Sequence, residues 1–339
     1  MRYRRLGPTD MRVSVICFGG GALADWPEHG LTRSDGVRAV EAALAAGINF
    51  FDTSEWYGMG ASEELLGEVL HTRRDSVYIA TKVGLHPYEA RGIRDSRPGR
   101  IVEHIDRALA RLRTDYVDLY QIHWPDPEVA MEDSWASMLR VQESGKARYI
   151  GVSNYRVQEM ERCLSVGPVH SLQSCFHMFR RELAEQEMPF CRSRRIGVMI
   201  WGPLAHGLLT GKFSASNPPN WPAGDWRLAM PIMQGDGFRR CMATVDELSR
   251  FAGVHGRTVM ELAVAWTLAQ PGVSTVITGA RTVVQLRQQL GGADWELSVR
   301  DLTEVEKILC GAPSWRALGG DPEFGGHHVL PVASRPELA

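Results

Sequence analysis

Short apolar runs rich in β-branched residues alternate along this chain with longer stretches in which apolar positions recur at helical spacing. Alternation of this kind is typical of repeated βα units, whose strands form a parallel sheet. We predict eight strands, at 13–18, 48–52, 77–82, 116–123, 147–153, 171–175, 197–201 and 274–278. Eight units favour an α/β fold in which the strands close into a (β/α)8 TIM barrel.

Helices are predicted between these strands and after the last one. They span 33–46, 62–70, 98–113, 132–145, 155–166, 182–194, 238–253, 258–269 and 282–290. Ser62, followed by Glu63 and Glu64, is typical of a helix start, and Gly47 and Gly145 are typical of helix ends. Ahead of the first strand, 3–14 reads as two extended pieces around a Gly-Pro-Thr-Asp turn. That pattern predicts a β-hairpin, which could plug one end of the barrel.

Two segments lie outside the regular pattern. Residues 202–237 form a long loop rich in Gly, Pro and Trp, and Trp221 and Trp226 indicate that it docks on the domain. The tail after Cys310 has little periodicity and is expected to be irregular, with its two histidines at 327–328 solvated rather than metal-binding. We therefore expect one barrel domain over 1–312 and an irregular tail over 313–339.

The composition fits a globular protein that acts on small molecules. Of 339 residues, 44% are hydrophobic and 23% are charged, which allows a sizeable core. A formal charge of -2, with no Lys/Arg block, argues against a nucleic-acid or anionic-lipid partner. No apolar stretch is long enough for a membrane span, and the run at 13–18 is too short for a signal peptide. Six cysteines without a C-x-x-C pair indicate reduced thiols, so we expect a cytoplasmic protein whose oligomeric state is unknown.

Polar, aromatic or glycine residues follow nearly every predicted strand. The strands end at 19–21, Asp52, Lys82, His123, Ser153, Asn154, Gln173, Trp201, Gly202 and 278–281. Strands that are buried on both faces have no structural reason to end in this way, whereas an active site at the carboxyl ends of barrel strands requires it. Period-two alternation places His123 above the apolar residues at 117 and 119, and Asp52 above those at 48 and 50.

Four of these residues suggest acid-base chemistry on a carbonyl oxygen. A buried Asp52 needs a partner, and Lys82 ends the next strand, so the two are expected to pair. Tyr57 follows Asp52 in the same loop, where a protonated lysine would lower the pKa of its phenol. His123, if neutral, could donate a hydrogen bond to the carbonyl. Taken singly, Asp52 and Lys82 are more simply explained as a structural ion pair, Tyr57 as a surface aromatic and His123 as a hydrogen-bonded core histidine. The joint position of the four favours a site.

These residues and their surroundings resemble the aldo-keto reductase superfamily, in the branch that holds bacterial reductases and potassium-channel β subunits. The matching stretches are FDTSEWYG, ATKVG, LRTDYVDLYQIHWPD, GKARYIGVSN, WGPLAHGLLTGKF and VITGARTVVQLRQQL. The resemblance implies a (β/α)8 barrel with a nicotinamide cofactor across its strand ends. It makes Tyr57 the general acid, Lys82 the group that lowers its pKa, Asp52 the holder of Lys82, and His123 the residue that orients the substrate.

The resemblance also implies a cofactor seat. Ser153, Asn154 and Gln173 would bind the carboxamide and Trp201 would stack on the nicotinamide. The pyrophosphate and adenosine would be held by Gly202, Pro203, Leu204, Ala205, Lys212, Gly279, Arg281, Gln285, Gln288 and Gln289. Gly20, Gly21 and Asp52 would also contact the cofactor. Gly20 and Gly21 replace the Thr-Trp of that branch and would open space near the nicotinamide, and the Gln288-Gln289 pair stands where Glu-Asn is usual.

Independently of the resemblance, Arg281 precedes Thr282, a plausible helix N-cap, and helix N-termini attract anions. This favours NADP(H) over NAD, although Arg281 could instead pair with a neighbouring helix. Trp26, Trp56 and Trp124, beside Tyr57 and His123, could wall a substrate pocket for apolar carbonyls or sugars, or merely anchor loops.

The leading interpretation is NADP-dependent reduction of an aldehyde or ketone to an alcohol. One alternative is an aldose dehydrogenase working in the oxidative direction with NAD(P). Another is a cofactor-binding regulatory protein, similar to channel β subunits, with little turnover. A Schiff-base lyase is disfavoured because Asp52 should keep Lys82 protonated. No metal site is expected, because neither H-x-H nor a carboxylate-histidine cluster ends a strand.

Overall fold

Eight parallel strands close into a barrel in the computed structural model, which describes residues 1–24, 30–85, 94–221 and 225–320. Neighbouring strands follow the order β10-β3-β4-β5-β6-β7-β8-β9 around the ring. Their bounds are β3 Ile16–Gly19, β4 Phe50–Asp52, β5 Tyr78–Val83, β6 Val117–Ile122, β7 Ala147–Ser153, β8 Ser171–Cys175, β9 Gly197–Trp201 and β10 Val273–Thr278. The predicted TIM barrel is confirmed.

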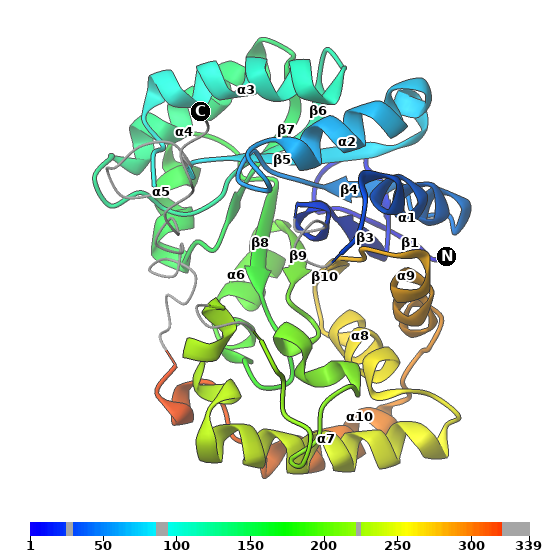
Figure 1. Ribbon diagram of the computed structural model, residues 1–339. Coiled ribbons are helices and arrows are strands. Elements are labelled where there is room, and N and C mark those ends of the chain that lie inside the picture. The colour runs from blue at the N-terminus through cyan, green and yellow to red at the C-terminus, as the bar shows by residue number, and fades with distance from the viewer. Residues whose placement is uncertain (25–29, 86–93, 222–224, 321–339) are drawn as a thin grey trace.

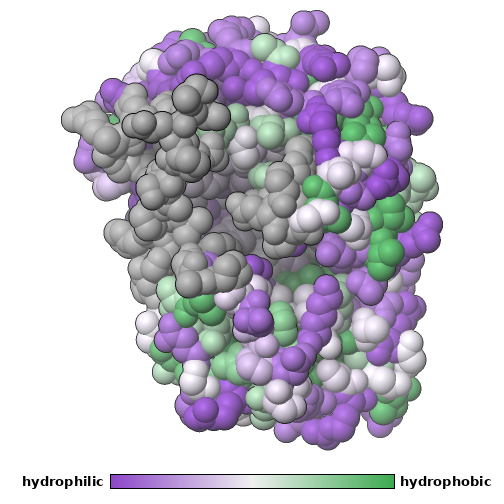
Figure 2. Space-filling model, in the orientation of Figure 1, coloured by the Kyte–Doolittle hydropathy of each residue, from purple (hydrophilic) through white to green (hydrophobic). Residues whose placement is uncertain are grey.

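Helices surround the strands as an outer layer (Figure 1). They are α1 Arg33–Ala45, α2 Ala61–Leu70, α3 Pro98–Leu112, α4 Met131–Glu143, α5 Val157–Val166, α6 Glu187–Arg194, α7 Gly235–Val254, α8 Val259–Ala269, α9 Val283–Leu290 and α10 Val299–Cys310. Apolar side chains fill the space between the two layers, and the outer face, for example over α3, is largely hydrophilic (Figure 2).

Two helix predictions need correction. The single helix expected over 182–194 is a short 3-10 turn, Glu182–Ala184, followed by α6, which begins at Glu187. Pro189 explains the break, because proline is tolerated only in the first turn of a helix. The helix α10 was not expected. Its start carries a capping box in which the Ser298 hydroxyl accepts from the Asp301 backbone, a signal that was present in the sequence.

An N-terminal hairpin plugs one end of the barrel, as the sequence suggested. Its strands are β1 Tyr3–Arg5 and β2 Arg12–Ser14, so the apolar run at 13–18 is divided between the hairpin and β3 rather than being one strand. Leu6, Met11 and Val13 are fully buried in the inner cluster of the barrel. Gly7 contacts the start of β9 so closely that an added Cβ would lie 2.4 Å from the Gly197 nitrogen. The hairpin therefore covers the end opposite the strand termini that carry the polar residues.

Inside the barrel, alternation holds along the strands but not at their first residues. Phe50 and Leu119 lie in the inner cluster, beneath Asp52 and His123 as predicted. The residues expected below them, Ile48 and Val117, pack in the outer cluster instead. Ile48 precedes β4 and Val117 opens β6, so both lie where the strand pleat has not yet been established.

Two irregular segments dock on the barrel. Within 202–237, Trp221 and Phe213 pack against the main hydrophobic cluster and against each other, with ring centroids 5.8 Å apart, so the segment docks at this tryptophan as predicted. The Trp226 side chain lies outside the described residues. After α10, Trp315 is 1% exposed and its backbone N–H donates to the Phe179 carbonyl at 2.7 Å. Positions 321–339, which include the two tail histidines, also lie outside the described residues. No described helix is both long and apolar enough to cross a membrane.

Candidate active site

A cleft of about 870 Å³ opens at the carboxyl ends of the barrel strands. The register of the strands sets the polar residues level with one another: Gly19 lies beside Asp52, Lys82 beside Gln121, Ser153 beside Gln173, and Cys175 beside Trp201. Of the four residues expected to act on the carbonyl, Asp52, Tyr57 and His123 line the cleft, and Lys82 lies behind Tyr57.

Lys82 lies at the centre of a buried network. Its Nζ donates to Asp52 Oδ2 at 2.6 Å, to the Thr53 carbonyl at 2.9 Å and to Tyr57 Oη at 3.3 Å. Its side chain is 0% exposed and that of Asp52 2%. Burial lowers the pKa of Lys82, but Asp52 and Tyr57 outweigh that effect and the pKa is raised overall. The ammonium therefore stays charged, as the sequence predicted.

Tyr57 differs from the expectation in one respect. Burial raises the pKa of its phenol, Lys82 opposes that rise without cancelling it, and the net pKa is raised. The Lys82 effect thus has the predicted direction but is smaller than the burial effect. The Tyr57 ring lines an open cleft and is only half-buried, so water can reach it. Burial therefore raises the pKa of Tyr57 less than that of Tyr120, which is fully buried in the core. In either case the phenol keeps its proton at neutral pH.

His123 is a neutral hydrogen-bonding group beside Tyr57. Burial, with a further contribution from Lys82, holds the pKa of its imidazole well below the ordinary value. The imidazole Nδ1 lies 3.3 Å from the Ser54 hydroxyl, and its ring meets the Tyr57 ring edge-on, with centroids 5.9 Å apart. A substrate oxygen placed between the Tyr57 hydroxyl and the free side of the His123 ring would thus face two donors.

Amide side chains join the acid-base group to the rest of the cleft. Gln173 Nε2 donates to Asp52 Oδ1 at 2.8 Å. Asn154, in the left-handed region at φ 63°, donates from Nδ2 to the His123 carbonyl at 3.0 Å. Its Oδ1 accepts from Trp201 Nε1 at 3.0 Å, which fixes the plane of the indole. One asparagine therefore positions both His123 and Trp201.

The other end of the cleft lies at the start of α9. Thr282 caps this helix, as predicted, by accepting from the Gln285 backbone at 3.3 Å. Gln285 Oε1 accepts from the Arg281 backbone at 2.9 Å, and Gln289 Nε2 donates to the Gly279 carbonyl at 2.9 Å. In the part of the chain that the structure describes, the buried Gln289 Oε1 has no hydrogen-bond partner. It is an acceptor available to a bound molecule.

Most residues expected to hold a cofactor line this one cleft. They are Gly21, Asp52, Ser153, Asn154, Gln173, Trp201, Gly202, Leu204, Lys212, Gly279, Arg281, Gln285, Gln288 and Gln289. Gly20, Pro203 and Ala205 are not among the lining residues. Gly20 packs against α2, where an added Cβ would lie 2.5 Å from the Ser62 hydroxyl, whereas a Cβ on Gly21 would face the Tyr57 ring at 3.7 Å. Only Gly21 therefore leaves room beside Tyr57.

The substrate end has an aromatic wall. Trp124 and Leu85 are buried together, with Trp56 and Trp201 packed against them. Trp56 and Trp124 line the cleft as expected, and Trp26 lies outside the described residues. Further lining residues were missed: Ala22, Ala24, Leu85, His206, Gly207, Thr210, Phe213, Arg227, Met260 and Ile277. Most are apolar or small and carry no chemical signal, but His206 follows Trp201 closely enough to have been considered.

A second buried network supports the Tyr57 loop from below. Glu55, two residues before Tyr57, is 2% exposed and accepts from Arg100 at 2.5 Å and from Arg111 at 3.0 Å. Arg111 also donates to Glu63 at 2.7 Å, near the start of α2. These contacts fix the loop between β4 and α2 at both ends. Glu55 was not predicted because nothing in the local pattern marks which acidic loop residues are buried.

Comparison with known proteins gives one consistent result. The model of the Aldo/keto reductase family matches residues 15–309. The chain is 34% identical to the aldo-keto reductase YhdN of Bacillus subtilis, over 91% of this chain and 94% of that protein. It is 30% identical to a probable aldo-keto reductase of Glycine max, over 89% and 87%.

Solved structures agree. The glycerol dehydrogenase AKR11B4 from Gluconobacter oxydans superposes with a TM-score of 0.84 at 32% identity, covering 92% of this chain and 96% of that one. The aldo-keto reductase AKR11C1 from Bacillus halodurans, solved in its holo form, gives 0.75 at 26% identity, covering 91% and 96%.

Proposed function

The chain belongs to the aldo/keto reductase family of oxidoreductases, and we propose that it reduces an aldehyde or ketone to an alcohol with NADP(H), using Tyr57 as the general acid. The observation that carries this proposal is the contact of Lys82 Nζ with both Asp52 and Tyr57 at the wall of the cleft. A protonated phenol, backed by a fixed positive charge, is suited to give its proton to a developing alkoxide.

Each of the four residues has a distinct task in this proposal. His123 and Tyr57 donate hydrogen bonds to the carbonyl oxygen and hold it in place. As the C–O bond becomes single, the Tyr57 proton passes to the oxygen, and the Lys82 ammonium at 3.3 Å stabilises the phenolate that remains. Asp52 keeps that ammonium charged and in position. When bound, a nicotinamide dinucleotide would supply a hydride, one hydrogen with two electrons, to form the new C–H bond at the carbonyl carbon.

The cleft fits such a cofactor. It runs from Tyr57 to α9 and contains an indole with a fixed plane, Trp201, and an available buried acceptor, Gln289 Oε1. Trp201 would stack on the nicotinamide, while Ser153 and Gln173 would meet its carboxamide. Asn154 Oδ1 accepts from Trp201 and has a second lone pair with which it could accept from the carboxamide.

Substitution of Tyr57 by phenylalanine tests the acid assignment. The variant Tyr57→Phe keeps the ring but removes the proton donor, so kcat should fall by about 10²–10⁴-fold, the usual contribution of a positioned acid. The Kd for NADPH, followed by cofactor fluorescence, should change little because the phenol acts on the substrate. Normal turnover by this variant would show that another group protonates the oxygen.

Arg281 supports NADP(H) over NAD(H). It lines the cleft directly before the capped start of α9, where a helix N-terminus adds to its positive charge. In Arg281→Ala, the Kd for NADPH should rise about tenfold or more while that for NADH changes by less than about threefold, because only NADPH carries the 2′-phosphate. The nearby Arg287→Ala serves as a matched control. Equal losses for both cofactors would contradict the preference.

Oxidation of a polyol is a second candidate. It is favoured by the similarity to a protein named as a glycerol dehydrogenase, and by a cleft that mixes polar groups with an aromatic wall. Hydride transfer is reversible, so the same four residues serve with Tyr57 as the base. Initial rates with NADPH, NADH and both oxidised forms, against a panel of aldehydes, ketones, keto-sugars and polyols, separate the two directions.

A further inference from the structure

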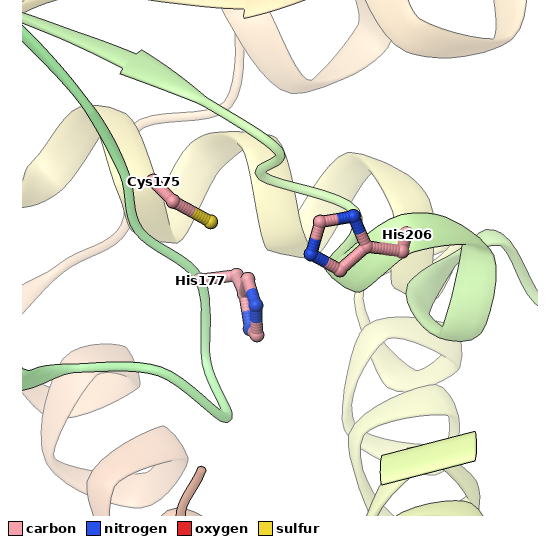
Figure 3. Close-up of side chains that lie close together, drawn as sticks. All are labelled: Cys175, His177 and His206. Carbon is pink, nitrogen blue, oxygen red and sulfur yellow. The ribbon is translucent and has the colours of Figure 1, made fainter. Parts of the chain in front are cut away.

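Three metal-binding side chains meet next to Trp201. Cys175 ends β8, His177 follows two residues later, and His206 lies in the turn after β9; Figure 3 shows them facing a common space. One ligand atom from each lies within 4.8 Å of the others. The two imidazole rings are nearly perpendicular, with centroids 5.7 Å apart. The cluster lies outside the acid-base group and has no task in the proposed reaction.

His177 has an unused nitrogen in this space. The residue is 0% exposed, and its Nδ1 accepts from the Phe179 backbone at a long 3.3 Å. Its Nε2 is buried and, within the described residues, has no hydrogen-bond partner. A buried polar group without a hydrogen-bond partner destabilises the fold. A ligand at Nε2 would remove this destabilisation.

Cys175 supplies a thiol that a metal ion would deprotonate. It is buried, and burial raises the pKa of the thiol to about 11, opposed by the charge of the Arg180 guanidinium and, to a smaller extent, by its hydrogen bond. A bound metal ion converts such a thiol to the thiolate and releases its proton. Burial also keeps the imidazoles of His177 and His206 neutral, the form that donates an electron pair. Arg180 lies near the cluster, and its positive charge disfavours binding of a cation. The negative charge of the thiolate that forms on binding would compensate the charge of Arg180.

The cluster borders two cavities. His206 is half-buried and lines the cleft, whereas Cys175 lines a separate cavity of about 530 Å³ and His177 is fully buried. Tetrahedral zinc has Zn–S of about 2.3 Å and Zn–N of about 2.0 Å, which sets ligand atoms roughly 3.3–3.7 Å apart. The three side chains therefore have to close by about 1 Å. The weak Phe179 contact has to open, because coordination at Nε2 moves the remaining imidazole proton to Nδ1.

We propose that Cys175, His177 and His206 bind a zinc ion, with water in the fourth position, and that the ion ties the loop after β8 to the turn after β9. One thiolate with two imidazoles suits zinc, whereas magnesium and calcium require oxygen ligands. The turn after β9 includes Gly202 of the cleft wall, whose added Cβ would lie 3.3 Å from Cys175 Sγ. The ion would thus hold the segment at which the family resemblance places the cofactor pyrophosphate, a placement that rests on the proposed function.

Cobalt provides a direct test on the full-length protein. Chelator-treated protein titrated with Co²⁺ should bind one equivalent and develop a thiolate-to-cobalt charge-transfer band, which Zn²⁺ then removes. Cys175→Ser should abolish the band, and His177→Asn and His206→Gln should each weaken Co²⁺ binding by at least about tenfold. Cys191→Ser, at a buried cysteine outside the cluster, is the matched control and should bind as the wild type does.

Thermal unfolding gives a second measurement that needs no turnover. Zn²⁺ should raise the Tm of the wild type and of Cys191→Ser but not of Cys175→Ser, because only a binding-competent folded state is stabilised. Absence of a charge-transfer band in folded wild-type protein, or a band that persists in Cys175→Ser, would overturn the proposal. Neither readout depends on carbonyl reduction, so this proposal and the proposed function can fail separately.

Discussion

Lys82 is a charged residue held in a wholly buried position. Its ammonium is satisfied by a carboxylate, a carbonyl and a phenol, so the burial that would otherwise drive off its proton is compensated. The same contacts disfavour the lyase alternative, which needs a neutral amine. At residue scale, the candidate chemistry rests on this compensation more than on any single catalytic group.

His123 should leave a signature in the pH dependence of stability. Its pKa in the folded state lies far below the ordinary value of 6.5. Below about pH 6.5 the imidazole is therefore protonated in the unfolded chain but stays neutral in the folded protein. The unfolded state then binds more protons, and the free energy of unfolding falls as pH falls. His123→Asn should flatten this acid limb by up to about 1.4 kcal/mol per pH unit.

Urea unfolding at pH 7, 6 and 5 measures the effect. His71→Asn, at an exposed histidine, is the control and should keep the wild-type slope. A His123→Asn variant that loses stability as steeply as the wild type would mean that the folded imidazole does take up the proton.

Sequence reasoning succeeded for residues whose position follows from strand register. Asp52 and Lys82 end adjacent strands, so their pairing could be expected from alternation and strand order alone. The double role of Asn154 could not, because it depends on a left-handed backbone and on the indole of a distant strand. The balance of effects on the Tyr57 pKa also depends on burial, which no linear pattern specifies.

At the scale of elements, the existence of each strand was predicted more accurately than its first and last residues. All eight barrel strands were placed, because β-branched runs alternate clearly with helical segments. The run at 13–18 was predicted as one strand because only Ser14 interrupts its apolar residues, although a bend at Val15 separates the hairpin strand from β3. Glu182–Ala184 and α6 were merged because helical spacing alone does not show where Pro189 forces a new start.

The hairpin should contribute stability without affecting chemistry. Leu6 is 0% exposed among inner barrel residues, so Leu6→Ala should lower the free energy of unfolding by about 2–5 kcal/mol through lost burial and a residual cavity. It lies at the end opposite Tyr57, so kcat of the folded variant should stay unchanged. Urea unfolding and steady-state kinetics on the same preparation test both statements.

Val254→Ala is the matched control for that experiment. Val254 is 86% exposed at the end of α7, so its truncation should change stability by less than about 0.5 kcal/mol. If Leu6→Ala changed the free energy of unfolding as little as Val254→Ala, the hairpin would cover the barrel end without contributing to the stability of the core. A fall in kcat would instead mean that the two ends of the barrel are coupled.

At the scale of the whole molecule, cofactor binding should stabilise the fold. The cleft draws residues from β3 to α9, so a dinucleotide bound along it would contact several βα units of the barrel. NADPH at 100 times its Kd should add about 2.7 kcal/mol to the free energy of unfolding. Tyr57→Phe should show the same gain and Arg281→Ala a smaller one at equal concentration. If NADPH did not raise the urea midpoint of unfolding, the proposed cofactor-binding site would be contradicted.

The junction between β3 and β10 has a consequence for how the protein is made. These neighbouring strands are the first and the last of the ring, so β3 emerges from the ribosome long before its partner exists. The cleft likewise needs residues from Gly19 to Gln289. A nascent chain therefore has to keep its early strands from aggregating without help from nucleotide, which can act only after synthesis has passed α9.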